Sequence, residues 1–258
     1  MVFGIFLFIQ RIEKGFMRYA IFSDVHGNLE SLVAVLSALK KERIDQYYFC
    51  GDIVGYGANP KECIEEIKKI NAICIAGNHD WAVAGAMGVE NFNLEAQEAI
   101  RWTAAELGDE DKEFLRNLKL VEHQNNFILV HGTLNNPEEF HYLVGFDQVV
   151  RSFSLMDRMV CFVGHSHVPK VFVENQGETV KEHSGFRVAL KDNCRYLVNV
   201  GSVGQPRDGN PQAAYCIFDS KNKTIEITRI GYDIKSAQNK IYKVGLPQGL
   251  GDRLSTGR

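Results

Sequence analysis

Short polar clusters follow five apolar, strand-length runs in this chain, each at the point where the run ends. The central cluster is Gly77-Asn78-His79-Asp80, directly after the run 72–76. The other four follow the runs 19–22, 47–50, 127–130 and 160–163, and they contain Asp24 with His26, Asp52, His131, and His165 with His167. Because open α/β sheets place ligand sites at the carboxyl ends of their strands, we expect the clusters to meet at one edge.

The residue types in these clusters are those that bind metal ions. Asp24 and His26 are two residues apart and can bend toward one ion, and His165 and His167 can serve two neighbouring ions. Asp52 has two carboxylate oxygens and can bridge a pair. Mixed oxygen and nitrogen ligands suit manganese, iron or zinc. Two ions about 3.5–4 Å apart clamp the attacking and leaving oxygens of a displacement at phosphorus.

A single cluster of this kind is weak evidence, since a lone Asp-x-His or His-Gly is more often a loop turn or a structural histidine. Five clusters at five strand ends predict a metal site, and five of the eight histidines fall in them. The other three, His123, His141 and His183, lack this context. We interpret them as structural or surface residues.

Strands and helices alternate in the first half of the predicted fold. Strands 19–22, 46–50 and 71–76 are separated by a helix over 29–43, with Asn28 as its cap, and by a second helix that begins at Pro60 and runs to about residue 70. This order predicts parallel strands with right-handed crossovers. Residues 81–118 are predicted to be helical, with breaks at 85–88 and 108–109 and with Asp109 capping the second part.

The second half is predicted to be rich in strands. Asn125-Asn126 is a two-residue hairpin signal between two short strands. Further elements are expected as a helix over 147–157, strands over 159–163, 168–174, 186–190, 194–200, 213–219 and 223–230, and a helix over 233–243. The two halves together predict an α/β fold in which two sheets lie face to face with helices outside.

Composition limits the classes of partner. The formal charge of −3 gives no basic surface for extended nucleic acid, and no segment can cross a membrane. None of the six cysteines stands in a Cys-x-x-Cys motif, so we expect buried, reduced thiols in a cytoplasmic protein. The apolar run 2–9 is too short to span a bilayer. Our hypothesis is that Met17 is the biological start or that residues 1–16 are a loosely attached extension.

The ordered motifs resemble those of the calcineurin-like metallophosphoesterases. They are Asp24-x-His26, Gly51-Asp52, Gly77-Asn78-His79-Asp80, His131-Gly132 and Gly164-His165-Ser166-His167. The stretch 198–207 resembles the small prokaryotic phosphodiesterase-like branch of that family. The resemblance implies a four-layer α/β/β/α sandwich of two mixed β-sheets flanked by helices. We expect this domain over residues 17–247, followed by a polar tail over 248–258.

The resemblance also implies roles for single residues. One ion would be held by Asp24, His26, Asp52 and His167, and the other by Asp52, Asn78, His131 and His165. A hydroxide shared by the metals would attack phosphorus, His79 would protonate the leaving oxygen, and Asp80 would orient His79. Manganese is the expected metal, with iron, zinc, nickel and magnesium as alternatives.

One departure from the family pattern bears on the substrate. Protein phosphatases and dinucleoside polyphosphate hydrolases of this family carry an Asp-Arg pair where this chain has Gly55 and Tyr56, and Glu where it has Asp80. This favours phosphodiesters, with phosphomonoesters as further substrates. Arg207 is the candidate replacement contact to phosphate, with a surface ion pair as the alternative. Tyr56 and Asn59 are candidates for the mouth of the site, with turn residues as the alternative.

Other functions remain open on the same motifs. The chain can be a non-catalytic metal-binding interaction module on this fold, or a protein phosphatase of the serine/threonine type. A nuclease acting on long DNA is disfavoured by the charge and the length. The expected partner is a small phosphate-ester substrate, with no extended nucleic acid and no membrane, and the expected state is a monomer or a homodimer.

Overall fold

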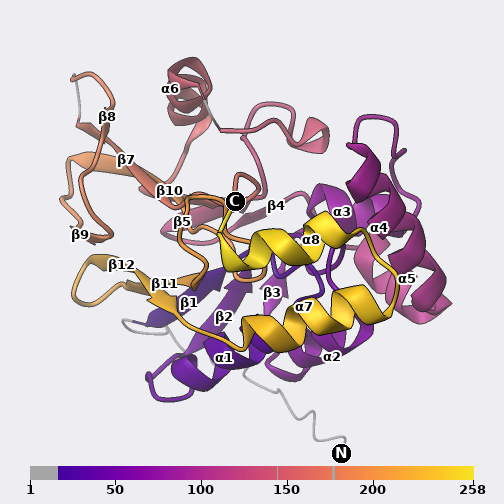
Figure 1. The fold of residues 1–258 in the computed structure, drawn as a ribbon. Helices are drawn as coiled ribbons and strands as arrows, with labels where there is room; N and C mark the ends of the chain where they lie inside the picture. The colour runs from indigo at the N-terminus through magenta and orange to yellow at the C-terminus, as the bar shows by residue number, and fades with distance from the viewer. Residues whose placement is uncertain (1–16, 144, 176–177) are drawn as a thin grey trace, which may run out of the picture.

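Two mixed β-sheets lie face to face and carry helices on their outer sides, as the ribbon in Figure 1 shows. The structure is a computed structural model that describes residues 17–143, 145–175 and 178–258. The predicted extension 1–16, and with it the hypothesis that Met17 is the start, lies outside the described residues. Within them each sheet has six strands. The predicted α/β/β/α sandwich is therefore confirmed.

The first sheet contains the parallel strands of the first half. Its order is β3 (Ile73–Cys74), β2 (Gln46–Phe49), β1 (Arg18–Phe22), β11 (Ala213–Asp219), β12 (Thr224–Ile230) and β9 (Arg187–Ala189). Strands β1, β2 and β3 run parallel, and β11 pairs antiparallel with β1. Helices α1 (Leu29–Leu39) and α2 (Pro60–Lys69) make the crossovers between the parallel strands. The Asn28 side chain caps α1 by accepting the Ser31 N–H, as predicted.

The second sheet begins with the predicted hairpin. Its order is β4 (Val121–His123), β5 (Phe127–Val130), β6 (Val160–Val163), β10 (Cys194–Asn199), β7 (Lys170–Asn175) and β8 (Lys181–Glu182). The Gln124 N–H donates to the Phe127 carbonyl at 2.8 Å, which closes the turn around Asn125 and Asn126. Strands β5, β6 and β10 run parallel, and α6 (Phe146–Leu155) connects β5 to β6.

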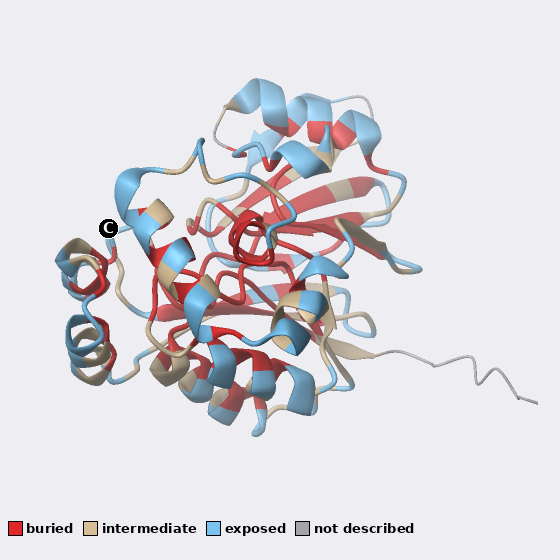
Figure 2. Ribbon diagram, turned by 90° about the vertical axis from the view of Figure 1, so that its right-hand side faces the viewer, coloured by how far each residue is buried: buried red, intermediate tan, exposed pale blue. Residues whose placement is uncertain are grey.

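Alternating side chains on the central strands fill two different layers of the core. On β1, Ile21 packs between the two sheets, whereas Ala20 and Phe22 pack against the helices that cover the first sheet. On β6, Phe162 packs between the sheets and Cys161 packs against the α6 side. Because both faces of these strands are covered, they appear as continuous apolar runs in the sequence. Figure 2 shows the buried strands between half-exposed helices.

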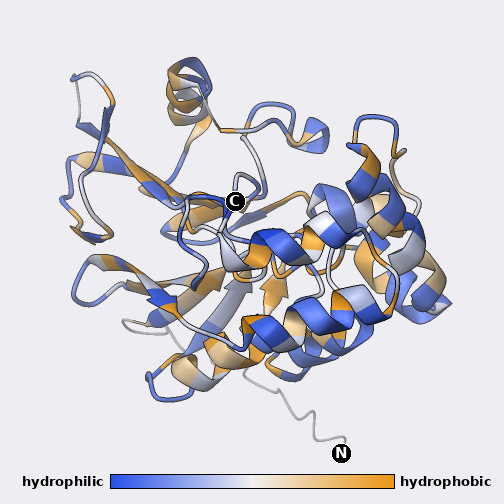
Figure 3. Cartoon of the chain, in the orientation of Figure 1, coloured by the Kyte–Doolittle hydropathy of each residue, from blue (hydrophilic) through white to orange (hydrophobic). Residues whose placement is uncertain are grey.

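Further helices cover the edge that carries the polar clusters. They are α3 (Asn78–Val83), α4 (Leu94–Glu106), α5 (Asp109–Arg116), η1 (Pro137–Glu139), α7 (Ile234–Lys243), α8 (Gln248–Asp252) and η2 (Arg253–Ser255). Blue and orange residues alternate along α7 and α8 in Figure 3, as expected for helices with one buried side. All six cysteines are free thiols, and five of them are buried.

Several predicted boundaries differ from the structure, and three of them have a plain physical reason. Helix α1 ends at Leu39, because the charged residues after it give the helix no further apolar side to bury. Strand 71–76 shortens to Ile73–Cys74, since Ile75 makes only an isolated bridge to Lys119. Asp109 is the first residue of α5 and not its cap, because Gly108 takes the cap position without a side-chain bond.

The predicted polar tail is instead folded against the domain. Leu250 of α8 and Leu254 of η2 are 1% and 3% exposed, and they pack with Ile241 of α7 and with Tyr56. The expectation of a tail was wrong because two leucines four residues apart lie on one side of the chain among glycines and charges. The C-terminal segment therefore helps to hold the loop that contains Tyr56.

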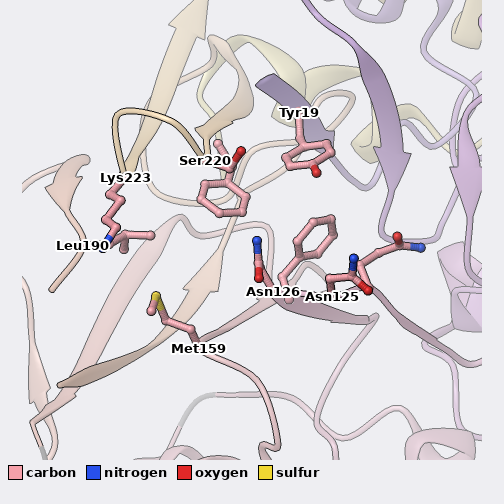
Figure 4. Close-up of a pocket in the computed structure, with 10 residues that line it drawn as sticks. Tyr19, Asn125, Asn126, Met159, Leu190, Ser220 and Lys223 are labelled. Carbon is pink, nitrogen blue, oxygen red and sulfur yellow. The ribbon is translucent and has the colours of Figure 1, made fainter. Parts of the chain in front are cut away.

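A cavity of about 440 Å³ opens between the two sheets at the end where β1, β5 and β6 begin. Tyr19, Asn125, Asn126, Met159 and Ser220 are among the residues that line it, as Figure 4 shows. Since the parallel strands run away from this cavity, it lies at the end of the sheets opposite the polar clusters.

The contact made by α8 can be tested by truncation of one side chain. We expect Leu250→Ala to lower the free energy of unfolding by about 2–5 kcal/mol, because the fully buried side chain leaves a cavity. Urea denaturation followed by circular dichroism measures this change. Leu155→Ala, at a side chain 50% exposed on α6, is the matched control and shifts the value by less than about 0.5 kcal/mol. Equal stability of the Leu250→Ala protein and the wild type would contradict the packing described above.

Candidate metal centre

The carboxyl ends of strands from both sheets bring the predicted ligands together. Loops after β1, β2 and β3 carry residues from the first sheet, and loops after β5 and β6 carry residues from the second. The seven predicted ligands are all buried, and they are Asp24, His26, Asp52, Asn78, His131, His165 and His167. Two of the groups that can hold a cation are Asp24 with His26 and His167, and Asp52 with His131 and His165.

The first group surrounds the Asp24 carboxylate. Its Oδ1 atom lies 3.3 Å from His167 Nε2 and 3.8 Å from His26 Nε2. The two imidazoles face each other with 3.0 Å between their Nε2 atoms. Two nitrogen lone pairs at this distance repel each other unless a proton or a cation lies between them. The arrangement therefore suits a shared cation.

The second group surrounds the Asp52 carboxylate, which lies between ligands from the first β-sheet and ligands from the second. Its Oδ2 atom is 3.3 Å from His131 Nε2 and 3.5 Å from His26 Nε2. Its Oδ1 atom accepts the His79 backbone N–H at 2.9 Å. Asp52 thus contacts members of both groups, which is what a bridging ligand requires. A further group of the same kind joins His79 to His26 and Asp52.

Backbone carbonyls fix the orientation of three imidazoles. His26 Nδ1 lies 3.1 Å from the Val54 carbonyl, His131 Nδ1 lies 2.6 Å from that of Cys50, and His167 Nδ1 lies 2.6 Å from that of Gln205. Because a carbonyl only accepts, each Nδ1 must carry the hydrogen. In the neutral ring the Nε2 lone pair then points into the centre, as in metal-binding histidines.

Unpartnered polar atoms test whether the residues fit a cation. Asn78 Oδ1 and His165 Nε2 are buried side-chain atoms without a hydrogen-bond partner. A buried polar atom without a partner costs about 1–3 kcal/mol. Carboxylate, amide oxygen and imidazole nitrogen together suit a divalent cation of the manganese, iron or zinc type. The residues present therefore fit a pair of divalent ions.

The backbone of the centre is strained. Five of the seven predicted ligands are non-glycine residues with positive φ, namely Asp24 (56°), His26 (50°), Asp52 (63°), His165 (64°) and His167 (60°). This left-handed conformation turns the chain tightly, so residues two apart both face the centre. Outside glycine it costs roughly 1–2 kcal/mol per residue. Such strain concentrates at functional sites.

Two glycines of the motifs allow close approach of the loops. A Cβ atom on Gly77 would lie 2.0 Å from Asp52 Oδ1, so any side chain there would displace the Asp52 carboxylate. Gly55 has φ of 93°, and a Cβ atom on it would lie 2.5 Å from His79 Nδ1. Gly55 therefore leaves room for the His79 ring.

Burial sets the protonation of the centre. It lowers the pKa of His79 to about 4, with the Asp52 carboxylate opposing this shift and Arg207 adding to it. It also lowers the pKa values of His26, His165 and His167.

His131 is different. Burial disfavours its protonation, but the Asp52 carboxylate outweighs burial and raises the pKa of His131 to about 9. Burial likewise disfavours the ionised form of Asp52, but His131 and His79 hold the Asp52 pKa well below its usual value. Without an ion, the His131 proton thus provides the positive charge that Asp52 requires, and a cation would have to displace it.

Asp80 does not hydrogen-bond to His79, contrary to the orienting role implied by the resemblance. Its Oδ2 atom accepts the N–H groups of Asp52 at 2.8 Å and Gly77 at 3.0 Å. Its Oδ1 atom accepts those of Ile53 at 2.9 Å and Val54 at 3.2 Å. His79 Nδ1 has no partner. Asp80 therefore clamps the loop that carries Asp52, because three successive N–H groups of that loop converge on its carboxylate together with the N–H group of Gly77.

Of the three residues predicted to contact substrate, the structure places Tyr56 and Arg207 near His79 but Asn59 elsewhere. The Tyr56 ring lies beside His79, with 4.4 Å between ring centroids, and the Arg207 Nη2 atom lies 3.5 Å from the Tyr56 hydroxyl. Arg207 also donates to the Gln205 side chain at 2.8 Å. The Asn59 side chain instead contacts Glu62 and Lys240, at the junction of α2 and α7. Asn59 is thus placed away from the mouth, because its amide bonds between two helices.

Sequence reasoning missed one wall of the site. A pocket of about 440 Å³ opens beside His79, Asn78 and His165, and Phe92, His141 and Tyr142 line it. The Tyr142 ring stacks on the His165 ring at 3.9 Å. His141, interpreted as a structural or surface residue, therefore lies at the mouth. No local pattern marks these residues, because loops distant in the sequence bring them together.

Two groups of potential metal ligands at the edge of an α/β/β/α sandwich are the arrangement expected of the class of metallophosphoesterases. A family model described as the calcineurin-like phosphoesterase superfamily domain matches residues 17–223. The chain therefore belongs to the calcineurin-like phosphoesterase superfamily, as the motif order indicated.

Individual relatives agree with this assignment. An uncharacterized protein of Methanocaldococcus jannaschii is 44% identical over 243 residues, which cover 93% of this chain and 98% of that protein. The crystal structure of a metallophosphoesterase from Sphaerobacter thermophilus is similar with a TM-score of 0.81 and 35% identity, over 94% of this chain and 99% of that one. A symmetrical bis(5'-nucleosyl)-tetraphosphatase of Actinobacillus succinogenes is 29% identical over 118 residues, which cover 43% of this chain and 42% of that enzyme.

Within the described ranges, no helix is both long enough and apolar enough to cross a bilayer.

Cation binding to the centre should be visible as a change in thermal stability. We expect manganese added to chelator-treated protein at 100 times its dissociation constant to stabilise the fold by about 2.7 kcal/mol for each ion bound, because the ions bind only the folded state. Differential scanning calorimetry measures the rise in Tm. His131→Ala should lose most of this rise, whereas His123→Ala, at an exposed histidine outside the centre, should keep it. If manganese did not change the Tm of the wild type, the assignment of these residues as a cation site would be contradicted.

The clamp made by Asp80 predicts a separate effect on stability. We expect Asp80→Ala to lower the unfolding free energy of the metal-free protein by about 3 kcal/mol or more, since it strips four buried N–H groups of their acceptor. Chemical denaturation gives the value. Asp192→Ala, which removes a surface carboxylate, should change it by less than about 1 kcal/mol. An Asp80→Ala protein as stable as the wild type would show that the clamp is unimportant.

Proposed function

We propose that this protein is a dinuclear metal-dependent phosphoesterase that hydrolyses phosphodiesters, with phosphomonoesters as further substrates. One observation carries the proposal: two ligand groups meet at the Asp52 carboxylate, directly beside His79 and an open pocket. A pair of cations can stabilise the attacking and leaving oxygens of a displacement at phosphorus, and an imidazole without a hydrogen-bond partner beside them can transfer a proton.

We infer that the residues divide between two ions as the family resemblance implies. Asp24, His26, Asp52 and His167 would hold one ion, and Asp52, Asn78, His131 and His165 would hold the other. Bound there, the two cations would supply a nucleophile from water at neutral pH and withdraw charge from the phosphoryl oxygens. The donor set favours manganese, with iron, zinc, nickel and magnesium as alternatives.

His79 is the residue placed to handle the proton of the leaving group. Its backbone N–H is held by Asp52, and its ring is held between Tyr56 and Phe92, with centroid distances of 4.4 Å and 5.0 Å. Its Nδ1 atom is free of intramolecular bonds. An anionic ester beside the ring stabilises its protonated form, which can then pass a proton to the leaving oxygen.

Arg207 is the proposed contact to a phosphoryl oxygen. Its guanidinium group lies beside the Tyr56 ring, 5.8 Å from the ring centroid, and no carboxylate pairs with it among the described residues. An arginine held by neutral groups keeps its charge available for phosphate. Arg207 thus approaches the site next to Tyr56, where the family's protein phosphatases carry an arginine in the loop itself.

Two observations favour a phosphodiesterase over the alternatives. A non-catalytic interaction module has no use for His79 oriented beside a complete ligand set and an open pocket. A protein phosphatase of the serine/threonine type would need the Asp-Arg pair that Gly55 and Tyr56 replace. The tetraphosphatase of Actinobacillus succinogenes is similar over less than half of this chain, so we do not assign its substrate to this protein. The proposed substrate is a small phosphate ester, and the proposed compartment is the cytoplasm.

Substitution of His79 tests the proposed function. With manganese bound, the wild type should cleave bis(4-nitrophenyl) phosphate, and His79→Ala should lower kcat by about 10²–10⁴-fold. Metal content by plasma mass spectrometry should stay the same in both proteins. His123→Ala is the control and should match the wild type.

Two results would contradict this account. Full activity of the His79→Ala protein would exclude the proton-transfer role. Loss of metal from that protein would make His79 a ligand, as its grouping with His26 and Asp52 permits.

A further inference from the structure

The pocket beside His79 has two apolar walls that come from distant parts of the chain. Met87 and Phe92 lie between α3 and α4, and Phe140 and Tyr142 follow η1. The volume of about 440 Å³ falls in the range of pockets that bind small organic molecules. The pocket therefore has room for an organic group in addition to a phosphate.

Aromatic side chains at the pocket favour a flat ring as its occupant. Phe92 meets the His79 ring edge to face, with a centroid distance of 5.0 Å and an angle of 80°. Tyr142 is 46% exposed although it stacks on His165 at 19°. Exposed aromatic faces bind planar heterocycles by stacking.

The charges of the pocket favour an uncharged occupant. Among the described residues that line it, none is a lysine or an arginine. Its carboxylate, Glu139, pairs with His141 at 2.5 Å. Besides Asn78, the carboxamides of Asn91 and Asn93 line it, and the Asn93 oxygen is used to cap α4 through the Ala96 N–H. The Asn93 amide N–H groups remain for the polar edge of a ring, whereas a second phosphate would find no lysine or arginine among the described lining residues.

The position of His79 tells which part of the ester enters the pocket. Since His79 lines the pocket and is proposed to protonate the leaving oxygen, the group bound there is the one that departs. We propose that the pocket binds the leaving alcohol of the substrate and that this alcohol is a nucleoside. The assignment rests on the proposed phosphodiesterase function and adds the identity of the leaving group.

The reaction is then hydrolysis with a defined direction. Water adds its oxygen to phosphorus, and the bond between phosphorus and the nucleoside oxygen breaks. The nucleoside leaves as the free alcohol with a proton from His79, and the protons released by the water restore His79 and enter solution. The other alcohol stays on the phosphate as a monoester.

A phosphodiester of two alcohols with similar leaving-group ability shows which of its two ester bonds the enzyme breaks. Adenosine 5'-(methyl phosphate) can give adenosine with methyl phosphate, or adenosine 5'-monophosphate with methanol. Because the two alcohols are similar leaving groups, the pocket decides between these outcomes. With the full-length, manganese-loaded protein we expect adenosine and methyl phosphate in at least about tenfold excess by liquid chromatography and phosphorus NMR. Adenosine 5'-monophosphate as the main product would overturn the proposal.

Substitution in the pocket wall tests the role of the ring. Phe92→Leu keeps an apolar side chain but removes the aromatic face, so kcat/KM for this diester should fall about 5- to 100-fold and the product excess should shrink. Leu94→Ala is the matched control, because Leu94 is 82% exposed and does not line the pocket. It should leave both values unchanged. A Phe92→Leu protein with wild-type rate and product ratio would overturn the proposal.

Adenosine binding separates failure of this inference from failure of the proposed function. Saturation-transfer NMR should detect adenosine on the wild-type protein, and Phe92→Leu should weaken it by a similar factor. If adenosine binds in this way but bis(4-nitrophenyl) phosphate is not cleaved, the phosphodiesterase function and the leaving-group assignment fail, and only a nucleoside pocket stands. If esters are cleaved but adenosine does not bind, the function stands and the pocket assignment is wrong.

Discussion

The buried Asp52 carboxylate is the contact on which the other features of the site depend. It is 1% exposed, and it lies within 3.5 Å of imidazole nitrogens of His26 and His131, which follow strands of different sheets. Its other oxygen holds the His79 backbone. A carboxylate taken out of water needs nearby positive charge and hydrogen-bond donors. The packing of two sheets face to face supplies both, because it brings their strand ends to one point.

This geometry requires backbone conformations and close contacts between polar atoms that are unfavourable in themselves. Five ligand residues adopt positive φ, and several of their polar atoms face one another without partners. Asp80 opposes this strain by accepting three N–H groups of the Asp52 loop and the N–H group of Gly77. Cations bound to the ligand atoms would remove the remaining repulsion. The centre is therefore a place where stability and function compete, and where a bound ion contributes to both.

The sequence was sufficient to predict the parts of the structure that depend on neighbouring residues in the chain. Apolar runs predicted β1, β2, β5 and β6, and the rule that ligands gather at strand ends brought Asp24 and His131 to one centre although they lie on different sheets. It did not predict the clamp made by Asp80, since that depends on how a turn aims its N–H groups. Nor did it predict the Phe92 and Tyr142 wall or the packing of α8, which arise from contacts between distant segments.

Anomalous X-ray diffraction from crystals grown with manganese tests the central claim most directly. Data collected at the manganese absorption edge locate each ion without reference to activity. The account predicts two strong anomalous peaks per chain, both in contact with the Asp52 carboxylate, one next to Asp24 and the other next to His131. A single peak, or two peaks that do not share Asp52, would contradict it.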